Sequence, residues 1–215
     1  MSASPPSTEP APAAGPLLSE PILTEIESYL RTRERRREEL ADRARKLRRA
    51  AQVAMTEMHA TGRAPAVLEE IRRECAALGQ TLQDDPGEHA VALDGLQEAV
   101  EAILLASVLA GHSLPGPRKL GVAAEPYLLG LGDLAGEVRR LALGALAGGS
   151  VDRAEGYLTT LDELLAALLR FDAPRSIVAL KPKQDAARGI VERTRGDVTL
   201  ARMLARARMG EASPP

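Results

Sequence analysis

Residues 40–60 read LADRARKLRRAAQVAMTEMHA, and this stretch decides the fold class. Small and aliphatic side chains recur in it at alternating steps of four and three positions, at Leu40, Ala44, Leu47, Ala51, Ala54 and Met58. Such steps place side chains on one face of an α-helix. The pattern therefore predicts a helix that packs lengthwise against other helices.

The same periodicity continues on both sides of this stretch, interrupted by turns rich in Pro and Gly. Helices are expected at about 19–61, 65–83, 88–110, 125–147 and 151–170, then from about 174 to a stop at Gly196-Asp197, with a short terminal helix at 200–209. No segment alternates apolar and polar residues as a strand would. The sequence predicts an all-α fold of six or seven antiparallel helices.

Composition predicts one helical domain with an aliphatic core. Aromatic residues make up only 2% of the 215 residues. Residues 1–17 form a Pro/Ala-rich stretch that we expect to be a disordered tail; 18–210 should form the single domain, and 211–215 a disordered end. The chain has a single cysteine, Cys75, no leader pattern and no apolar run of about 18 residues. We therefore expect a cytoplasmic protein without a membrane partner.

The predicted helix at 125–147 carries an unusual acidic pair. Asp133 and Glu137 are one helical turn apart, and Gly132 and Gly136 lie beside them. Glycine inside a helix costs about 1 kcal/mol relative to alanine, so a compensating role is expected. Small residues allow a neighbouring backbone to approach closely, which predicts that another helix packs here.

A second acidic pair, Glu98 and Glu101, lies three residues apart on one face of the preceding helix. If the two helices pack side by side, four carboxylates converge and raise one another's pKa unless a cation intervenes. Mg²⁺ or Mn²⁺ would suit such oxygen ligands and would assist phosphodiester hydrolysis. From spacing alone, ordinary solvated acids on helix surfaces are the alternative.

The sequence offers little support for other kinds of catalytic site. The three histidines, His59, His89 and His112, are isolated from one another, and we expect surface or packing positions for them. Neither acidic pair has the histidine three residues after a glutamate that di-iron bundles use. No phosphate-binding P-loop and no dinucleotide motif is present.

Residues 125–140, EPYLLGLGDLAGEVRR, resemble the segment DYLLGxxDLTGELxR of the translin family. Residues 97–102, QEAVEA, are similar to QEYVEA of TRAX, the subunit that supplies the catalytic carboxylates of the translin–TRAX ribonuclease. Translin lacks this glutamate pair, so Glu98 and Glu101 indicate the TRAX-like type. Arg45 and His59 fall on matching positions of the first helix, whereas Lys46 and Gln52 depart from the family pattern.

The resemblance covers about residues 22–200 and includes weaker matches at 149–152, to an SGD turn, and at 183–185, to the K/R-x-x-D start of the closing helix. It implies a translin-like helical bundle and a metal-assisted nuclease site made of Glu98, Glu101, Asp133 and Glu137, with Mg²⁺ or Mn²⁺ as the cofactor. Asp133 and Glu137 would chiefly hold the metal, and the other two would complete its shell and position the attacking water.

The family also forms closed octameric shells that enclose single-stranded RNA, and a prokaryotic form with one subunit type would be a homo-octamer. We therefore expect an endoribonuclease acting on short single-stranded RNA. The alternatives are a translin-type protein that binds single-stranded DNA or RNA without cutting it, and a purely structural helical scaffold.

Basic residues crowd positions 31–49, although the net charge is −2. The residues expected to hold phosphates inside the shell are Arg45, Arg48, Arg49 and Arg140. The alternative for the segment is a solvated helix face paired with Glu34, Glu38, Glu39 and Asp42.

Overall fold

The computed structural model describes residues 17–84 and 86–211, without the side chains of 84, 86 and 208–211. The elements are α1 Glu20–Thr61, α2 Leu68–Asp84, the 3₁₀ turn η1 Pro86–Glu88, α3 His89–Leu109, α4 Pro117–Leu120, α5 Ala124–Ala147, α6 Val151–Leu168 and α7 Leu180–Glu211. Neither described range contains a strand. The all-α prediction is confirmed, with seven α-helices in this part of the chain. None of these helices combines the length and apolarity needed to cross a bilayer.

The chain divides into two compact units, Met1–Glu39 and Leu40–Pro215. The first contains the N-terminal half of α1, where exposed Arg31 pairs with Glu27 at 2.9 Å. The second contains every predicted site residue. The predicted tails at 1–17 and 211–215 lie almost wholly outside the described residues, so they and the single-domain boundaries stay predictions.

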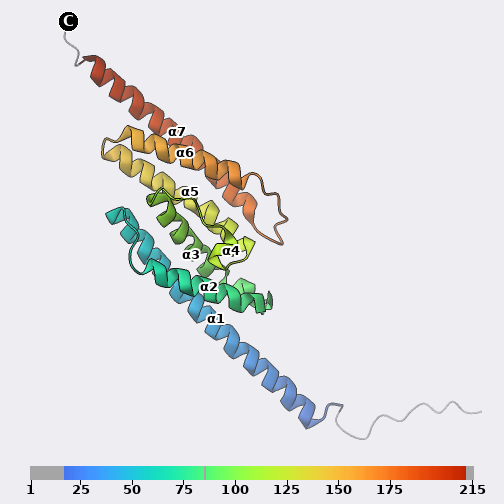
Figure 1. Cartoon of the computed structure of the whole chain (residues 1–215). Coiled ribbons are helices and arrows are strands. Elements are labelled where there is room, and N and C mark those ends of the chain that lie inside the picture. Colours follow the sequence, from blue (N-terminus) through green and yellow to red (C-terminus); the bar gives the residue numbers. More distant parts are fainter. Residues whose placement is uncertain (1–16, 85, 212–215) are drawn as a thin grey trace, which may run out of the picture. The chain divides into compact units, whose positions relative to one another are not determined.

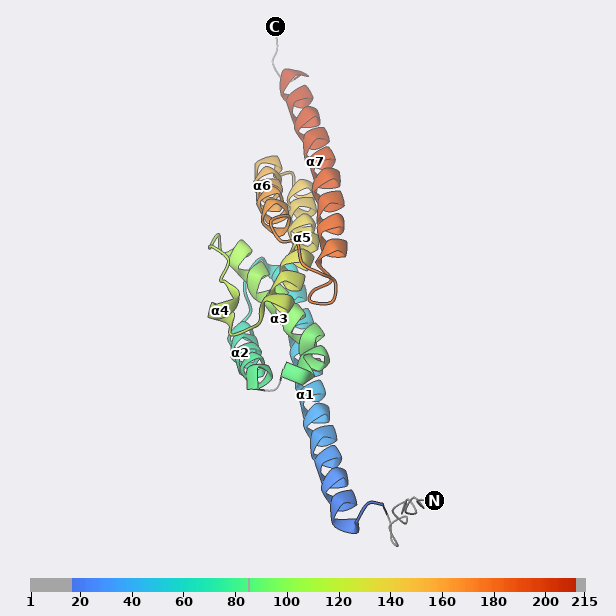
Figure 2. The ribbon, with the colours of Figure 1, turned by 90° about the vertical axis from the view of Figure 1, so that its right-hand side faces the viewer.

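Helix α5 is central to the second unit, because α3, α6 and α7 all pack against it. Figure 1 shows α5 between α3 on one side and α6 and α7 on the other, and Figure 2 shows α6 and α7 flanking α5. Helix α2 packs on α3. The six positions of the predicted α1 seam are all buried in the same aliphatic core as α3 and α5. The seam prediction is therefore confirmed.

Two predicted boundaries near the C-terminus are wrong. The last long helix begins at Leu180 rather than near Pro174, because residues 175–177 form a turn. It then continues through Gly196-Asp197 without a break. The Asp197 carboxylate does not cap a new helix, since it pairs with Arg139 of α5 at 2.9 Å. Packing of the next residue, buried Val198, also holds this stretch against its neighbours. The short helix α4 lies where the sequence indicated only a loop.

Replacing Gly95 with alanine should destabilise the bundle. A Cβ at Gly95 would lie 2.5 Å from the backbone oxygen of Ala44, so α1 and α3 must separate to admit it. We expect the free energy of unfolding to fall by about 2 to 3 kcal/mol, measured by urea denaturation at fixed protein concentration. The matched control is Gly156→Ala on α6, where a Cβ meets no atom within 4 Å. Equal stability of the two variants would contradict the close approach of α1 and α3.

Candidate functional site

A close approach of α3 to α5 brings the two acidic segments together. A Cβ at Gly130 of α5 would lie 2.7 Å from the backbone oxygen of Gln97, so only glycine permits this spacing. The side chain of Gln97 also reaches α5, where its Nε2 donates to Oδ2 of Asp133, one turn after Gly130, at 2.5 Å. The expectation that these helices pack side by side is therefore confirmed.

Helix α7 reaches the same place through Lys183. Its Nζ donates to Asp133 Oδ1 at 2.5 Å, which makes an ion pair between half-buried groups. A Cβ at Gly132 would lie 2.7 Å from Lys183 Cβ, so this glycine allows α7 to approach α5 closely, as the sequence predicted for a neighbouring helix. Gln184 fixes the start of α7, because its Nε2 donates to the carbonyl oxygens of Leu168 and Phe171 at 2.9 and 2.8 Å. A Cβ at Gly136, by contrast, would meet no atom within 4 Å.

The four predicted carboxylates Glu98, Glu101, Asp133 and Glu137 are called the acidic set here. Glu101 is its buried member, with a relative exposure of 7%. Burial, and then the charges of Asp133, Glu137 and Glu98, together raise its pKa to about 8, although the charge of Lys183 acts to lower it. Within residues 17–84 and 86–211, no side chain donates a hydrogen bond to Glu101 or forms an ion pair with it. A surface acid would be solvated, so the alternative of ordinary helix acids does not describe this residue.

His59, at the end of α1, completes the surroundings of Glu137. The imidazole is 8% exposed and its Nε2 contacts Glu137 Oε2 directly. The expectation of a surface or packing position gave no indication of this contact, because 78 positions separate His59 from Glu137 and sequence spacing cannot report a contact between them. His89 fits the packing expectation, with its Nε2 3.1 Å from the Leu82 carbonyl oxygen, and His112 is exposed.

The donor atoms of the acidic set are compatible with the metal that the sequence predicts. Its oxygen donors are of the type that Mg²⁺ and Mn²⁺ prefer, and buried Glu101 lacks a cationic partner in the described part of the chain. No three Asp, Glu, His or Cys side chains of the described ranges are, however, already arranged to hold a metal ion. Lys183 and His59 instead engage Asp133 and Glu137. The donor chemistry thus fits a divalent cation, and the carboxylates must turn to coordinate one.

The predicted phosphate-binding arginines are all exposed, at Arg45, Arg48, Arg49 and Arg140. Asp42 lies 3.5 Å from Arg45 and 2.7 Å from Lys46, and the hydrogen bond from Lys46 lowers its pKa. This part of α1 therefore contains cations that pair with Asp42, as expected for a solvated helix face, and also Arg48 and Arg49, which pair with no carboxylate of the described residues. Arg140 lies one helical turn after Glu137 on α5 and has no carboxylate partner among the described residues.

Comparison with known proteins gives close likeness in structure. The crystal structure of AfC3PO is 29% identical, with a TM-score of 0.72, and the match covers 85% of this chain and 97% of that one. A structure of AfC3PO in complex with duplex RNA is 27% identical, with a TM-score of 0.71 and the same coverage. Apo-NeC3PO is 24% identical, with a TM-score of 0.77 over 87% of this chain and all of that one, and shows the fold alone.

The chain is a translin-like protein. No family model matches it. Among curated proteins, the uncharacterized protein MJ0175 of Methanocaldococcus jannaschii is 36% identical over 103 residues. The match spans 47% of the translin-like chain and only 46% of that relative. The resemblance seen in residues 97–102 and 125–140 thus agrees with the fold of the C3PO structures, which belong to the translin family.

Proposed function

We propose that this translin-like protein is a metal-dependent endoribonuclease that cleaves short single-stranded RNA inside a homo-oligomeric shell. The proposal rests chiefly on Glu101, a buried carboxylate that no described residue pairs with directly and on which the charges of three further carboxylates act more than that of Lys183. Structural proteins seldom keep such an arrangement, because desolvation and repulsion both act against it. A divalent cation would turn that repulsion into attraction.

In this proposal Glu98, Glu101, Asp133 and Glu137 hold Mg²⁺ or Mn²⁺. When bound, the metal would activate a water molecule and neutralise charge on the phosphodiester. The surrounding side chains have positioning roles: Gln97 and Lys183 orient Asp133, and His59 orients Glu137. The Lys183 ammonium also adds positive charge where a phosphate would approach.

RNA as the substrate, and assembly into an octameric shell in the cytoplasm, are part of the same proposal. AfC3PO is described in complex with duplex RNA, which supports RNA binding by proteins of this fold. The pairing in that complex makes duplex RNA a necessary comparison in any substrate test. The exposed arginines Arg45, Arg48, Arg49 and Arg140 would contact phosphates.

The deciding experiment incubates the purified chain with a labelled single-stranded RNA in Mg²⁺, in Mn²⁺ and in EDTA. We expect cleavage within the strand in either metal and none in EDTA, with slower cleavage of the corresponding duplex. Native mass, measured with and without the RNA, should correspond to a multimer that retains its cargo. A protein that leaves the strand intact in both metals would contradict the nuclease proposal.

A second candidate function is nucleic-acid binding without cleavage. It is favoured by the contacts of Asp133 with Lys183 and of Glu137 with His59, because these satisfy two of the four carboxylates without a metal. A single-stranded DNA or RNA that binds in a salt-dependent manner, and is recovered uncut in Mg²⁺, would favour this function.

A further inference from the structure

A pocket of about 600 Å³ lies beside the acidic site, between the end of α1, α5 and the first turns of α6. Volumes of this size are typical of pockets that bind small ligands. His59 connects the two places, since its ring lines the pocket and its Nε2 contacts Glu137. A molecule that contacts His59 in this pocket would therefore be one side chain removed from Glu137.

The charged side chains that line the pocket are basic. Its lining includes Arg140 and Arg153 but no aspartate or glutamate. Neither arginine has a carboxylate partner among the described residues. By contrast, Arg139, the residue before Arg140, is paired with Asp197, and Arg195 of α7 is paired with Asp162. Unpaired guanidinium groups in a concave site are suited to binding phosphate.

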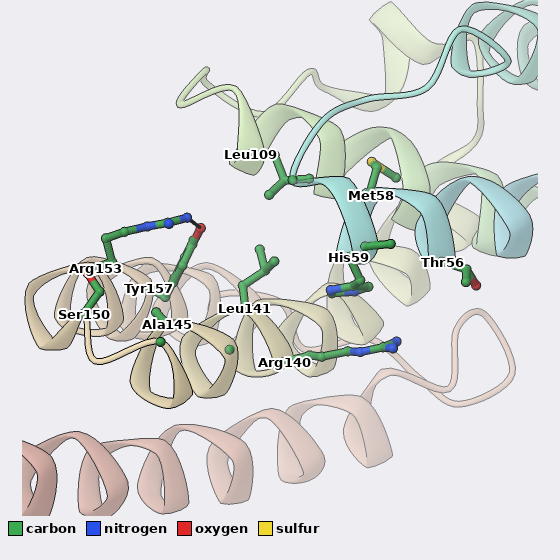
Figure 3. A pocket seen from close by; sticks show the side chains of 14 residues that line it. Thr56, Met58, His59, Leu109, Arg140, Leu141, Ala145, Ser150, Arg153 and Tyr157 are labelled. Atoms are coloured by element: carbon green, nitrogen blue, oxygen red, sulfur yellow. Dashed lines mark hydrogen bonds between the residues drawn. The ribbon is translucent and has the colours of Figure 1, made fainter.

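The two cations lie at opposite ends of the pocket. Figure 3 shows Arg153 with Tyr157 at one end, His59 with Arg140 at the other, and Leu141 between them. Arg153 Nη2 donates to the Tyr157 hydroxyl at 3.3 Å, which holds the guanidinium beside an aromatic ring. The middle is apolar, and an aromatic ring with an apolar floor is a surface on which nucleobases stack.

We propose that this pocket, the α1–α5–α6 pocket, binds the nucleotides that flank the cleaved phosphate of a single-stranded nucleic acid. One backbone phosphate contacts Arg153 and another contacts Arg140, while the base between them packs on Tyr157 and Leu141. The His59 end directs the strand toward Glu137. This inference rests on the proposed function for the identity of the reaction, but its binding test does not require cleavage.

The test measures binding of a fluorescein-labelled short single-stranded RNA in EDTA, by anisotropy over a series of salt concentrations. Arg153→Gln should weaken binding about tenfold and lower the slope of log Kd against log salt by about 0.7, as expected for one lost phosphate contact on a single strand. Arg153→Lys, which keeps the charge, should recover most of the affinity.

A second variant fills the pocket without removing any polar group. A Cβ at Gly144 on the pocket wall would meet no atom within 4 Å, so Gly144→Leu is accommodated by the fold and occupies the space. We expect at least tenfold weaker binding and an unchanged or higher Tm. The matched control is Gly196→Leu on α7, which is equally open and lies outside the pocket lining. Its Kd should equal that of the wild type.

The outcomes separate this inference from the nuclease proposal. Wild-type affinity in both Arg153→Gln and Gly144→Leu would overturn the pocket assignment, even if the wild-type chain cleaves RNA in Mg²⁺. A change in native mass caused by Gly144→Leu would overturn it too, because it would assign the pocket to contacts between subunits. Weakened binding in both variants, without cleavage by the wild type, would support the pocket and contradict the nuclease.

Discussion

Glu101→Gln should reduce kcat for RNA cleavage by several orders of magnitude while leaving the affinity for RNA nearly unchanged. The substitution keeps the size of the side chain and removes only its ability to carry a negative charge in the buried centre of the acidic set. A neutral amide is a weaker ligand for a hard divalent cation, and loss of an essential ligand removes stabilisation of the transition state. Single-turnover cleavage in saturating Mg²⁺, with RNA binding in EDTA as a companion measurement, gives both quantities.

Glu192→Gln provides the matched control for that measurement. Glu192 is an exposed residue of α7, so the same substitution of glutamate by glutamine is made there outside the acidic set. Its variant should cleave at the wild-type rate. If Glu101→Gln also cleaved at the wild-type rate, the buried carboxylate would have no part in the reaction, and the proposed metal site would be wrong.

The periodicity of apolar residues predicted the helices well because burial of one helix face is a local property of the sequence. The α1 seam from Leu40 to Met58 is an example, since each member lies within one turn of the next. Gly196-Asp197 shows where local signals fail. The partner that holds Asp197 inside α7 is Arg139 of α5, which lies far away along the chain.

The acidic site was partly predictable for the same reason. Spacing placed Glu98 with Glu101 and Asp133 with Glu137, each pair on one helix, and Gly132 indicated a close neighbour. Spacing cannot identify contacts between helices. Lys183 is 50 positions from Asp133, and their contact depends on the packing of α7 against α5. The weak match at residues 183–185 was the one signal in the sequence that pointed there.

The stability of the metal-free protein should fall as pH rises from about 4.5 to about 8 because of Glu101. In the unfolded chain this carboxyl loses its proton near its ordinary pKa of 4.5, whereas the folded chain keeps the proton until about 8. Between these values the folded state binds more protons, so the free energy of unfolding decreases with pH. Since a tenfold change in proton affinity corresponds to about 1.4 kcal/mol, the full effect is limited to about 5 kcal/mol.

The measurement is the difference in unfolding free energy between wild type and Glu101→Gln in EDTA, at fixed protein concentration, at pH 5 and pH 8. On going from pH 5 to pH 8, the free energy of unfolding of the glutamine variant should rise by several kcal/mol relative to that of the wild type, because glutamine cannot ionise. Adding Mg²⁺ at pH 8 should raise the Tm of the wild type and not that of the variant, since a ligand stabilises only the state that binds it. A difference that does not depend on pH would mean that Glu101 is solvated in the folded protein, and a response to Mg²⁺ in both proteins would place the cation at other residues.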